Sequence, residues 1–574
     1  MLATLHLILL SFVYRTKERR KEKPTARQHP STRPCVSLET PTRIRCFQLD
    51  SAAAQAGPSS LPPVARGASP PVRVLEMLRR NILLGFCIFL PFVVYLQSLG
   101  NGFVAWDDGL LITENPIITG LSFHNLWLAF TSYDPELYIP LTFLSYQINY
   151  MFGGLDPFGY HLLNLVLHIA NAVMVGMIIR FFIKSPAHKD GYALFGDVAP
   201  WFAALLFAIH PLHTEAVVWA AARKDVLSAF FFLWTVLSYL KSREAYDHQL
   251  SAFRWYWLSV VMFLLALLSK VSVITWPVLM LLMDWYRGEK IDRKMIVRAL
   301  PSFFLSVAFG IIALGGKIAN TGFLWEKFLM GCRAVTLLLQ EFFWPSGLSA
   351  LYPFTKSVSL FSQELFLSVL FVLFVSVVVL WFAARRGLRL PLFVWGWFLL
   401  LLAPSFSNIT KGHNELLDIY VTTDRYAYLP SVGLILACSL FAIYLFQRLP
   451  RLVGTSIFFI LFVFSILSYK QSLVWKNTLT LFTHVAEVQP RSYVAWSNIG
   501  TEEVHRGRLN EGLQAYTKAL QIRDDATTWY NVGQILREQG KRELAIEAYE
   551  RAVESSPLEV DAKKALQELK MGSM

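Results

Sequence analysis

The feature that most constrains this chain is a series of long apolar runs between about residue 80 and residue 470. Each run has roughly 16 to 25 residues, and a helix of that length can cross a hydrocarbon core of about 30 Å. Hydrophobic residues make up 55% of the 574 residues and charged residues only 16%, which is too little charge to cover the surface of a soluble protein. The sequence therefore predicts an all-α, polytopic helical membrane protein.

The runs predict about eleven membrane spans. They lie near residues 81–99, 158–182, 195–212, 217–240, 255–270, 271–287, 297–315, 364–383, 388–407, 427–447 and 452–469. A twelfth segment, 327–345, contains Lys327, Arg333 and Glu341. If this segment spanned, the basic stretch 385–389 would fall on the side away from Arg79 and Arg80, which the positive-inside bias opposes. We therefore expect 327–345 to be an interfacial helix.

With this topology the basic loops share the cytoplasmic side. Loop 100–157 holds six acidic residues and no Lys or Arg, so we expect it on the extracytoplasmic side. The last span then delivers residues 471–574 to the same compartment. That compartment is a periplasm for a bacterial inner membrane or an endoplasmic reticulum lumen in a eukaryote.

Residues 1–76 are expected to lie apart from the membrane domain at 77–470. They are rich in Arg, Pro and Ser, which predicts disorder or a start codon assigned too early, since Met77 opens a conventional beginning. Residues 1–80 hold nine of the thirteen net positive charges. No basic patch is left for a folded domain, so nucleic acid is not an expected partner.

The C-terminal region, 471–574, has an internal repeat of about 33 residues. Small, aromatic and glycine positions recur in order: Trp496, Gly500, Gly507, Tyr516 and Ala519 match Trp529, Gly533, Gly540, Tyr549 and Ala552. This order is typical of tetratricopeptide helix–turn–helix units. We expect two units preceded by a half unit at Leu479–Pro490. Such repeats usually bind peptides or proteins, and the alternatives are a generic helical hairpin or a cap on the membrane domain.

Two adjacent carboxylates, Asp107 and Asp108, follow the first span directly. One of them could take a proton from an acceptor hydroxyl and make it a nucleophile. Alternatively the pair could hold a divalent cation that neutralises a departing phosphate. A solvated Asp-Asp-Gly turn explains the same residues without any chemistry. No Cys has metal-ligand spacing, so no resident metal is predicted and a divalent cation stays one alternative.

Ionisable residues cluster again at the outer ends of the third and fourth predicted spans: His210, His213, Glu215, Arg223, Lys224 and Asp225. Charges in an apolar helix are costly and usually mark a site or an ion pair. Arg223 beside Lys224 suits a lipid-linked phosphate, with His210, His213, Glu215 and Asp225 in support. Eight residues separate Glu215 from Arg223, which predicts a shared helix face. The alternative is an ion pair of Asp225 with Arg223 or Lys224.

Two isolated cations, Lys270 and Arg425, are expected on the same side. Both could contact a phosphate. Alternatively, each is an anchor whose charged end reaches the membrane interface.

These segments together resemble the transmembrane and tetratricopeptide-repeat-containing O-mannosyltransferases and their prokaryotic relatives. The resemblance rests on Trp-Asp-Asp after the first span, His-Pro-Leu-His-Thr-Glu followed by Arg-Lys-Asp, Leu-Ser-Lys, Asp-Arg-Tyr-Ala-Tyr-Leu-Pro-Ser and the repeats, in this order over about 78–560. It implies a C-type glycosyltransferase fold, a polyprenyl-phosphate sugar donor and a catalytic acid at Asp107 or Asp108. Val271 stands where relatives often have Glu, and the repeat array is short, so no particular protein acceptor is carried over.

The resulting hypothesis is a glycosyltransferase that moves a sugar, such as the hexose mannose, from a polyprenyl phosphate to a Ser or Thr hydroxyl of a protein. Arg223, Lys224, Lys270 and Arg425 would bind the donor phosphate. Two alternatives stay open. One is an enzyme of the same fold that glycosylates a lipid or a glycan, and the other is a non-catalytic membrane scaffold that presents its repeats to partners.

Overall fold

The computed structural model of the chain describes residues 70–133, 137–183, 198–245, 249–316, 324–408, 419–556 and 559–571. Regular structure in these ranges is helical, apart from one isolated β-bridge between Pro353 and Tyr420. The prediction of an all-α fold is confirmed. Most of the expected N-terminal extension lies outside the described residues, and the first described helix begins at Pro70.

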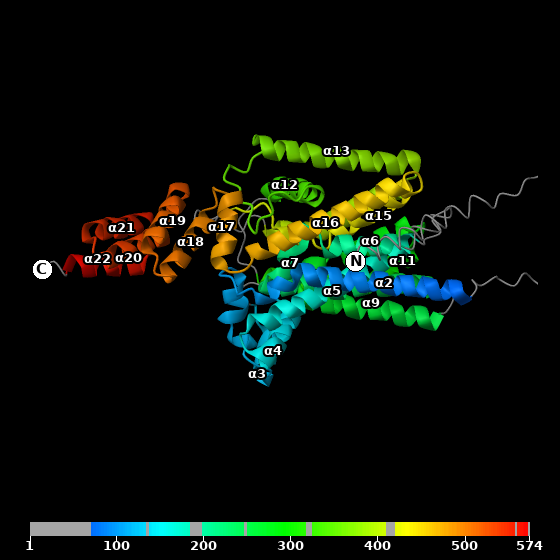
Figure 1. The fold of residues 1–574 in the computed structure, drawn as a ribbon, viewed down its shortest axis with the longest axis horizontal. Helices are drawn as coiled ribbons and strands as arrows, with labels where there is room; N and C mark the ends of the chain where they lie inside the picture. Colours follow the sequence, from blue (N-terminus) through cyan, green and yellow to red (C-terminus); the bar gives the residue numbers. More distant parts are fainter. Residues whose placement is uncertain are drawn as a thin grey trace, which may run out of the picture. The chain divides into compact units, whose positions relative to one another are not determined.

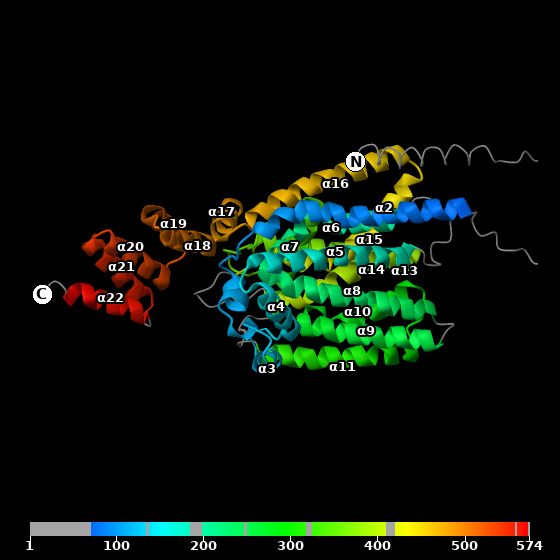
Figure 2. The same ribbon diagram turned by 60° about the horizontal axis from the view of Figure 1, so that its bottom comes forward.

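A bundle of long helices forms the first part of the described chain (Figure 1). Its members are α2 (Pro70–Tyr95), α5 (Pro157–Ile183), α6 (Ala199–Ala208), α8 (Arg223–Glu244), α9 (Gln249–Ser269), α10 (Trp276–Tyr286), α11 (Arg293–Gly315), α12 (Leu324–Phe343), α13 (Gln363–Arg386), α14 (Arg389–Leu402), α15 (Ser431–Phe446) and α16 (Pro450–Val474). Figure 2 shows α5, α8, α9, α10 and α11 running alongside one another.

Shorter elements connect the long helices near the candidate site. They are η1 (Leu96–Gly100), η2 (Gly109–Thr113), η3 (Pro116–Ile118), α3 (Phe123–Thr131), α4 (Pro140–Gly153), η5 (Pro211–His213), α7 (Thr214–Val218), η6 (Ala220–Ala222), η8 (Val271–Val273), η9 (Ala403–Asn408) and η10 (Asp424–Ala427).

Seven helices of the described chain are long and apolar enough to cross a membrane, or eight if the bent pair Ala199–Ala208 and Pro211–Val218 forms one span. All eleven predicted spans coincide with helices of the described chain, and two of these helices are shorter than a full-length span. Val271–Tyr286 and Ser431–Phe446 are apolar but short. The predicted span 217–240 begins only at Arg223, because the chain before it folds into short turns.

The predicted interfacial segment forms α12, which has one buried and one exposed face. Leu329, Met330 and Leu338 are buried, whereas Leu324 and Trp325 are exposed. This two-sided helix is not among the seven candidate spans, in keeping with a helix that lies along an interface.

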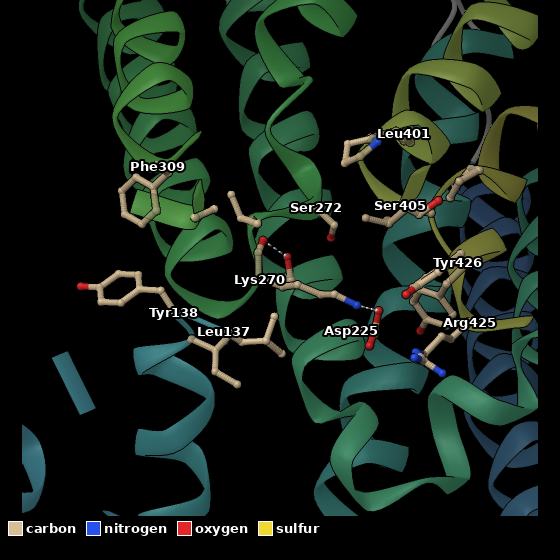
Figure 3. A pocket seen from close by; sticks show the side chains of 18 of the residues that line it. Leu137, Tyr138, Asp225, Lys270, Ser272, Phe309, Leu401, Ser405, Arg425 and Tyr426 are labelled. Carbon is tan, nitrogen blue, oxygen red and sulfur yellow. Dashed lines mark hydrogen bonds and ion pairs between the residues drawn. The ribbon is translucent and has the colours of Figure 1, made fainter. Parts of the chain in front are cut away.

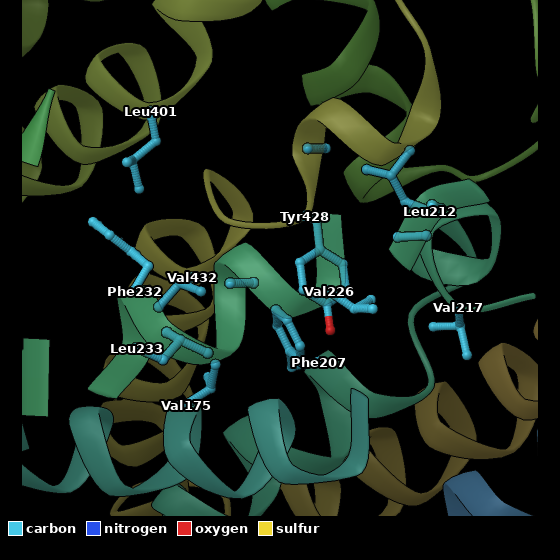
Figure 4. Packing of buried hydrophobic residues seen from close by; sticks show 14 of the residues in the cluster. Val175, Phe207, Leu212, Val217, Val226, Phe232, Leu233, Leu401, Tyr428 and Val432 are labelled. Carbon is cyan, nitrogen blue, oxygen red and sulfur yellow. The ribbon is translucent and has the colours of Figure 1, made fainter. Parts of the chain in front are cut away.

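The bundle core is close-packed around α5, α6, α8 and α15. Figure 4 shows Val175, Phe207, Val226 and Val432 from these helices, and Tyr428 from the turn before α15, pointing toward one another. Gly176 of α5 lies so close to α6 that an added Cβ would stand 2.7 Å from the carbonyl oxygen of Pro200. This close approach fixes α6, and with it the turn that leads to the charged cluster.

The C-terminal helices pair as the repeat predicts. They are α17 (Thr478–Val488), α18 (Tyr493–His505), α19 (Leu509–Ile522), α20 (Ala526–Glu538), α21 (Arg542–Ser555) and α22 (Val560–Met571). Gly500 and Gly533 occupy equivalent places, where an added Cβ would stand 2.6 Å and 2.5 Å from Tyr516 and Tyr549. The small and aromatic positions of each unit therefore set the close approach of its two helices.

Candidate functional site

The loop after η1 places its two carboxylates in different environments. Asp108 is 1% exposed, and its side chain accepts hydrogen bonds from the amides of Val104 and Ala221, both at 2.8 Å. The side chain of Asp107 is 36% exposed and lies 3.0 Å from the Nζ atom of Lys224. Asp108 thus ties the loop to the turn before α8, and Asp107 is the carboxylate that a substrate can reach.

The two carboxyl groups also differ in acidity. Burial raises the pKa of Asp107, but the positive charges of Lys224, Arg425 and Lys270 outweigh it and leave the pKa below its usual value. Burial raises the pKa of Asp108 to about 7, although its two backbone hydrogen bonds oppose the shift. Asp107 is therefore ionised at neutral pH, while Asp108 is close to its midpoint.

The first turn of α8 sends three consecutive charged side chains in three directions, because successive residues of a helix differ by about 100°. Arg223 turns into the bundle, where it donates hydrogen bonds to Asn164, Ser145 and the carbonyl of Tyr160. Lys224 meets Asp107.

Asp225, the third of these residues, points the other way and accepts a 2.5 Å hydrogen bond from Lys270. The alternative interpretation, an ion pair of Asp225 with Arg223 or Lys224, is therefore not what forms: Asp225 of α8 pairs across helices with Lys270, which follows α9.

Glu215 and Arg425 form a second buried pair. Both the guanidinium and the backbone amide of Arg425 donate to the Glu215 carboxylate. The expectation that Glu215 and Arg223 share a helix face was wrong, because α7 ends at Val218 and a separate turn, η6, precedes α8. Glu215 instead holds Arg425 beside the ring of Trp219, with the guanidinium carbon 4.8 Å from the ring centroid.

A cavity of about 110 Å³ opens beside these pairs. Its charged lining consists of Asp225, Lys270 and Arg425, and Figure 3 shows these side chains pointing toward one another. Tyr138, Phe309 and Leu401 are among the apolar groups of the remaining wall. One oxygen of Asp225 and the Nε atom of Arg425 are buried and have no hydrogen-bond partner among the described residues, so one acceptor and one donor are left at this wall.

His210 and His213 are held by the protein itself. The Nε2 atom of His210 lies 3.0 Å from the carbonyl oxygen of Phe342, and its Nδ1 accepts from the amide of Leu212. His213 bridges the carbonyl of Phe207 and the hydroxyl of Ser431. These bonds suit the expected supporting role, since they fix the turn between α6 and α7.

The structure thus brings Asp107, Lys224, Asp225, Lys270 and Arg425 to one end of the bundle, together with Glu215. Arg223 lies next to them in sequence but faces neutral partners. Among the described residues no group of three or more His, Cys, Asp or Glu side chains could hold a metal ion, and the expectation of a possible divalent cation stays untested.

Sequence reasoning missed Trp219 and Tyr426. The Trp219 ring lies 5.0 Å from the Nζ atom of Lys224 as well as beside Arg425. Tyr426 lies beside both Arg425 and Lys270. An aromatic residue within a few positions of an unexplained cation was the available signal, because rings often accept cations in cation–π contacts.

Fold and site together define a class: a helical membrane protein that has a cavity lined by ion-paired side chains at one end of its bundle, followed by a tetratricopeptide-repeat tail. The tetratricopeptide repeat family model matches residues 526–557. The protein O-mannosyl-transferase tmtc2 of Xenopus laevis is 33% identical over 249 residues, which are 40% of this chain and 28% of that protein. Protein O-mannosyl-transferase Tmtc2 of Drosophila melanogaster is 35% identical over 37% of this chain and 22% of its own length.

The homologues of this chain are therefore protein O-mannosyl-transferases, and the matched region spans less than a third of the length of these curated relatives. Among solved structures, ArnT from Cupriavidus metallidurans, bound to undecaprenyl phosphate, is 14% identical with a TM-score of 0.32. The comparison covers 88% of this chain and 79% of ArnT.

Proposed function

We propose that this protein is a glycosyltransferase that moves a hexose such as mannose from a polyprenyl-phosphate carrier to a Ser or Thr hydroxyl of a protein, on the extracytoplasmic side of a membrane. The observation that carries the proposal is the pairing of the accessible Asp107 carboxylate with Lys224, next to the cavity lined by Lys270 and Arg425. The similarity to protein O-mannosyl-transferases supports both the sugar and the acceptor class.

In the proposed reaction, Asp107 orients the acceptor hydroxyl and takes its proton as the oxygen attacks the anomeric carbon. The new C–O bond forms as the bond from carbon to the phosphate oxygen breaks, and the phosphate leaves with the electron pair. One direct displacement of this kind inverts the anomeric centre. The lowered pKa of Asp107 keeps it in the ionised form that this role needs.

The departing phosphate gains negative charge and needs nearby cations more than a general acid. Lys270 and Arg425 supply that charge at the cavity wall, and Lys224 supplies it beside Asp107. Each cation has an acidic partner, so the empty site is close to neutral and its charges are already oriented. Arg223 would act less directly, because its guanidinium bonds to α4 and α5 residues and holds the start of α8 in place.

The test is a transfer assay with purified full-length protein, synthetic polyprenyl-phosphate mannose and Ser/Thr-containing peptides. We expect label in the peptide, and we expect Asp107→Asn to abolish transfer while expression and folding are kept. The matched control is Glu114→Gln, which neutralises an exposed acid of the same loop and should leave the rate unchanged. Label in lipid instead of peptide would move the acceptor to the lipid class. An unchanged rate for Asp107→Asn would remove the assignment.

A further inference from the structure

Residues 475–482, which follow the last bundle helix and include the start of α17, contact the loop that carries Asp107. We call these residues the joining segment. The amide of Gly102 donates to the carbonyl oxygen of Lys476 at 3.0 Å, and the amide of Ala105 donates to the hydroxyl of Thr478 at 3.0 Å. Trp106 packs edge-to-face against Phe482, with ring centroids 6.1 Å apart. Two backbone bonds and one ring contact therefore hold the five residues directly before Asp107.

The same segment also reaches the cations of the site. Trp475 is 2% exposed and stacks on Trp219, with ring centroids 5.6 Å apart. The ring of Trp219 in turn lies beside both Lys224 and Arg425. The joining segment thus contacts the loop that carries Asp107 through hydrogen bonds, and it contacts Trp219, the ring beside the two cations, through a tryptophan stack.

The first repeat helix also belongs to the bundle by its packing. Leu481, Phe482 and Val485 of α17 lie in the same buried cluster as Val104 and Trp219, whereas the cluster around Tyr549 is a separate one in the later repeats. The position of α17 is therefore fixed by the same core that surrounds the site.

We infer that Thr478 is a positioning residue for the proposed transfer reaction: its hydroxyl holds the 102–106 loop so that the Asp107 carboxylate stands beside Lys224. The inference rests on the proposed function for its kinetic consequence, but the contacts themselves can be tested without any activity. In physical terms, a loop amide that loses its only acceptor will sample other conformations, and a displaced carboxylate loses rate without losing donor affinity.

The structure supplies a matched control on the same helix. The hydroxyl of Thr480 accepts the amide of Asn477 and completes the cap of α17, and it does not bond to the 102–106 loop. Thr480→Val therefore removes a hydroxyl and weakens α17 locally, while Thr478→Val removes the hydroxyl that holds Ala105. Thr478→Ser keeps the acceptor and serves as the conservative variant.

The first measurement is amide hydrogen exchange in the full-length protein, resolved to the amides of Gly102 and Ala105. We expect exchange at Ala105 to rise about five- to tenfold in Thr478→Val, the effect of about one hydrogen bond, and to stay near the wild-type rate in Thr478→Ser and Thr480→Val. Unchanged exchange at Ala105 in Thr478→Val, or an equal rise in Thr480→Val, would overturn the inference.

The second measurement distinguishes a positioning role of Thr478 from a general loss of structure. With the mannose donor and peptide acceptor, Thr478→Val should lower kcat roughly tenfold with the KM for donor unchanged, and Thr478→Ser should restore kcat. A rise in KM with an unchanged kcat would contradict the positioning role. If the wild-type protein transfers no sugar, the proposed function fails, and the exchange result still decides whether the joining segment holds the loop.

Discussion

Two charged clusters lie at opposite ends of α8, and they differ in what surrounds them. At the start of the helix, Lys224 meets a partly exposed carboxylate, and Asp225 lines a cavity. Sixteen residues further on, about 24 Å along the helix axis, Tyr239 donates a 2.5 Å hydrogen bond to Asp284, which is fully buried. Arg298 donates to the same carboxylate at 2.8 Å.

The second cluster joins α8, α10 and α11 through Asp284, with Arg243 and Glu289 completing it. Its residues do not line the described cavity. The comparison teaches that a charge inside an apolar bundle does not by itself mark a functional site. The first cluster has a partly exposed carboxylate, Asp107, and a carboxylate that lines a cavity, Asp225, whereas in the second cluster Asp284 is enclosed by its own partners and links three helices.

The largest expected effect is a direct test of this comparison between the two clusters. Asp107→Asn should lower transfer at least about 100-fold, since proton transfer by a positioned group is worth 10² to 10⁴, and it should cost less stability than Asp284→Asn because the Asp107 side chain is 36% exposed. Asp284→Asn should have the opposite pattern, a large loss of stability with little loss of transfer. It removes one partner of a buried network and should cost about 3 kcal/mol of stability, while each folded molecule keeps near wild-type turnover.

Both variants of that pair are measured by thermal unfolding and by transfer rate per folded protein. Equal loss of turnover in the two would show that the clusters do not divide into a site and a structural link.

A smaller effect is expected at the cavity wall. Lys270→Met removes one cation that faces the donor phosphate, so the KM for donor should rise about 10- to 100-fold, the worth of a charge-assisted hydrogen bond. Arg298→Met removes a cation of the other cluster and should leave the KM for donor unchanged. Steady-state kinetics with varied donor concentration measures both. A normal KM in Lys270→Met would remove Lys270 from the phosphate site.

Much of the fold could be predicted because its signals are local. Apolar run length gave the positions of the helices, and the spacing of glycine and aromatic residues gave the repeats. The start of α8 could not be predicted in this way. The turn before α8 is held by three hydrogen bonds. Tyr146 donates to the carbonyl of Ala220, Asn164 donates to the carbonyl of Trp219, and Asp108 accepts from the amide of Ala221. These partners come from segments more than fifty residues away.

The candidate site shows the same limit. Sequence reasoning placed these acids and cations at one end of the bundle, where the structure also has them, but it could not assign their partners. Arg223 and Lys224 are neighbours in sequence, yet one faces Asn164 and the other faces Asp107. The helix phase that decides between them depends on where α8 begins, which is set by the long-range contacts of the preceding turn.

The smallest expected effect is on the pH dependence of stability, and it compares the two adjacent carboxylates of the site, Asp107 and Asp108. The pKa of Asp108 in the folded protein is about 7, above its unfolded value. Between about pH 4 and pH 7 the folded state therefore binds more protons than the unfolded state, so stability from this group falls as pH rises and levels off above pH 7. Asp107, with a lowered pKa, contributes stability that is lost only in acid, below its unfolded pKa.

In thermal unfolding from pH 5 to pH 8, the stability of the wild-type protein relative to that of Asp108→Asn should thus fall, whereas its stability relative to that of Asp107→Asn should stay level. Asn at position 108 cannot ionise, so the pH-dependent part is removed whatever the variant does to the absolute stability. A decline that persists unchanged in Asp108→Asn would assign it to another group. It would also leave the two backbone bonds of Asp108, and not its burial, as the dominant influence on its charge.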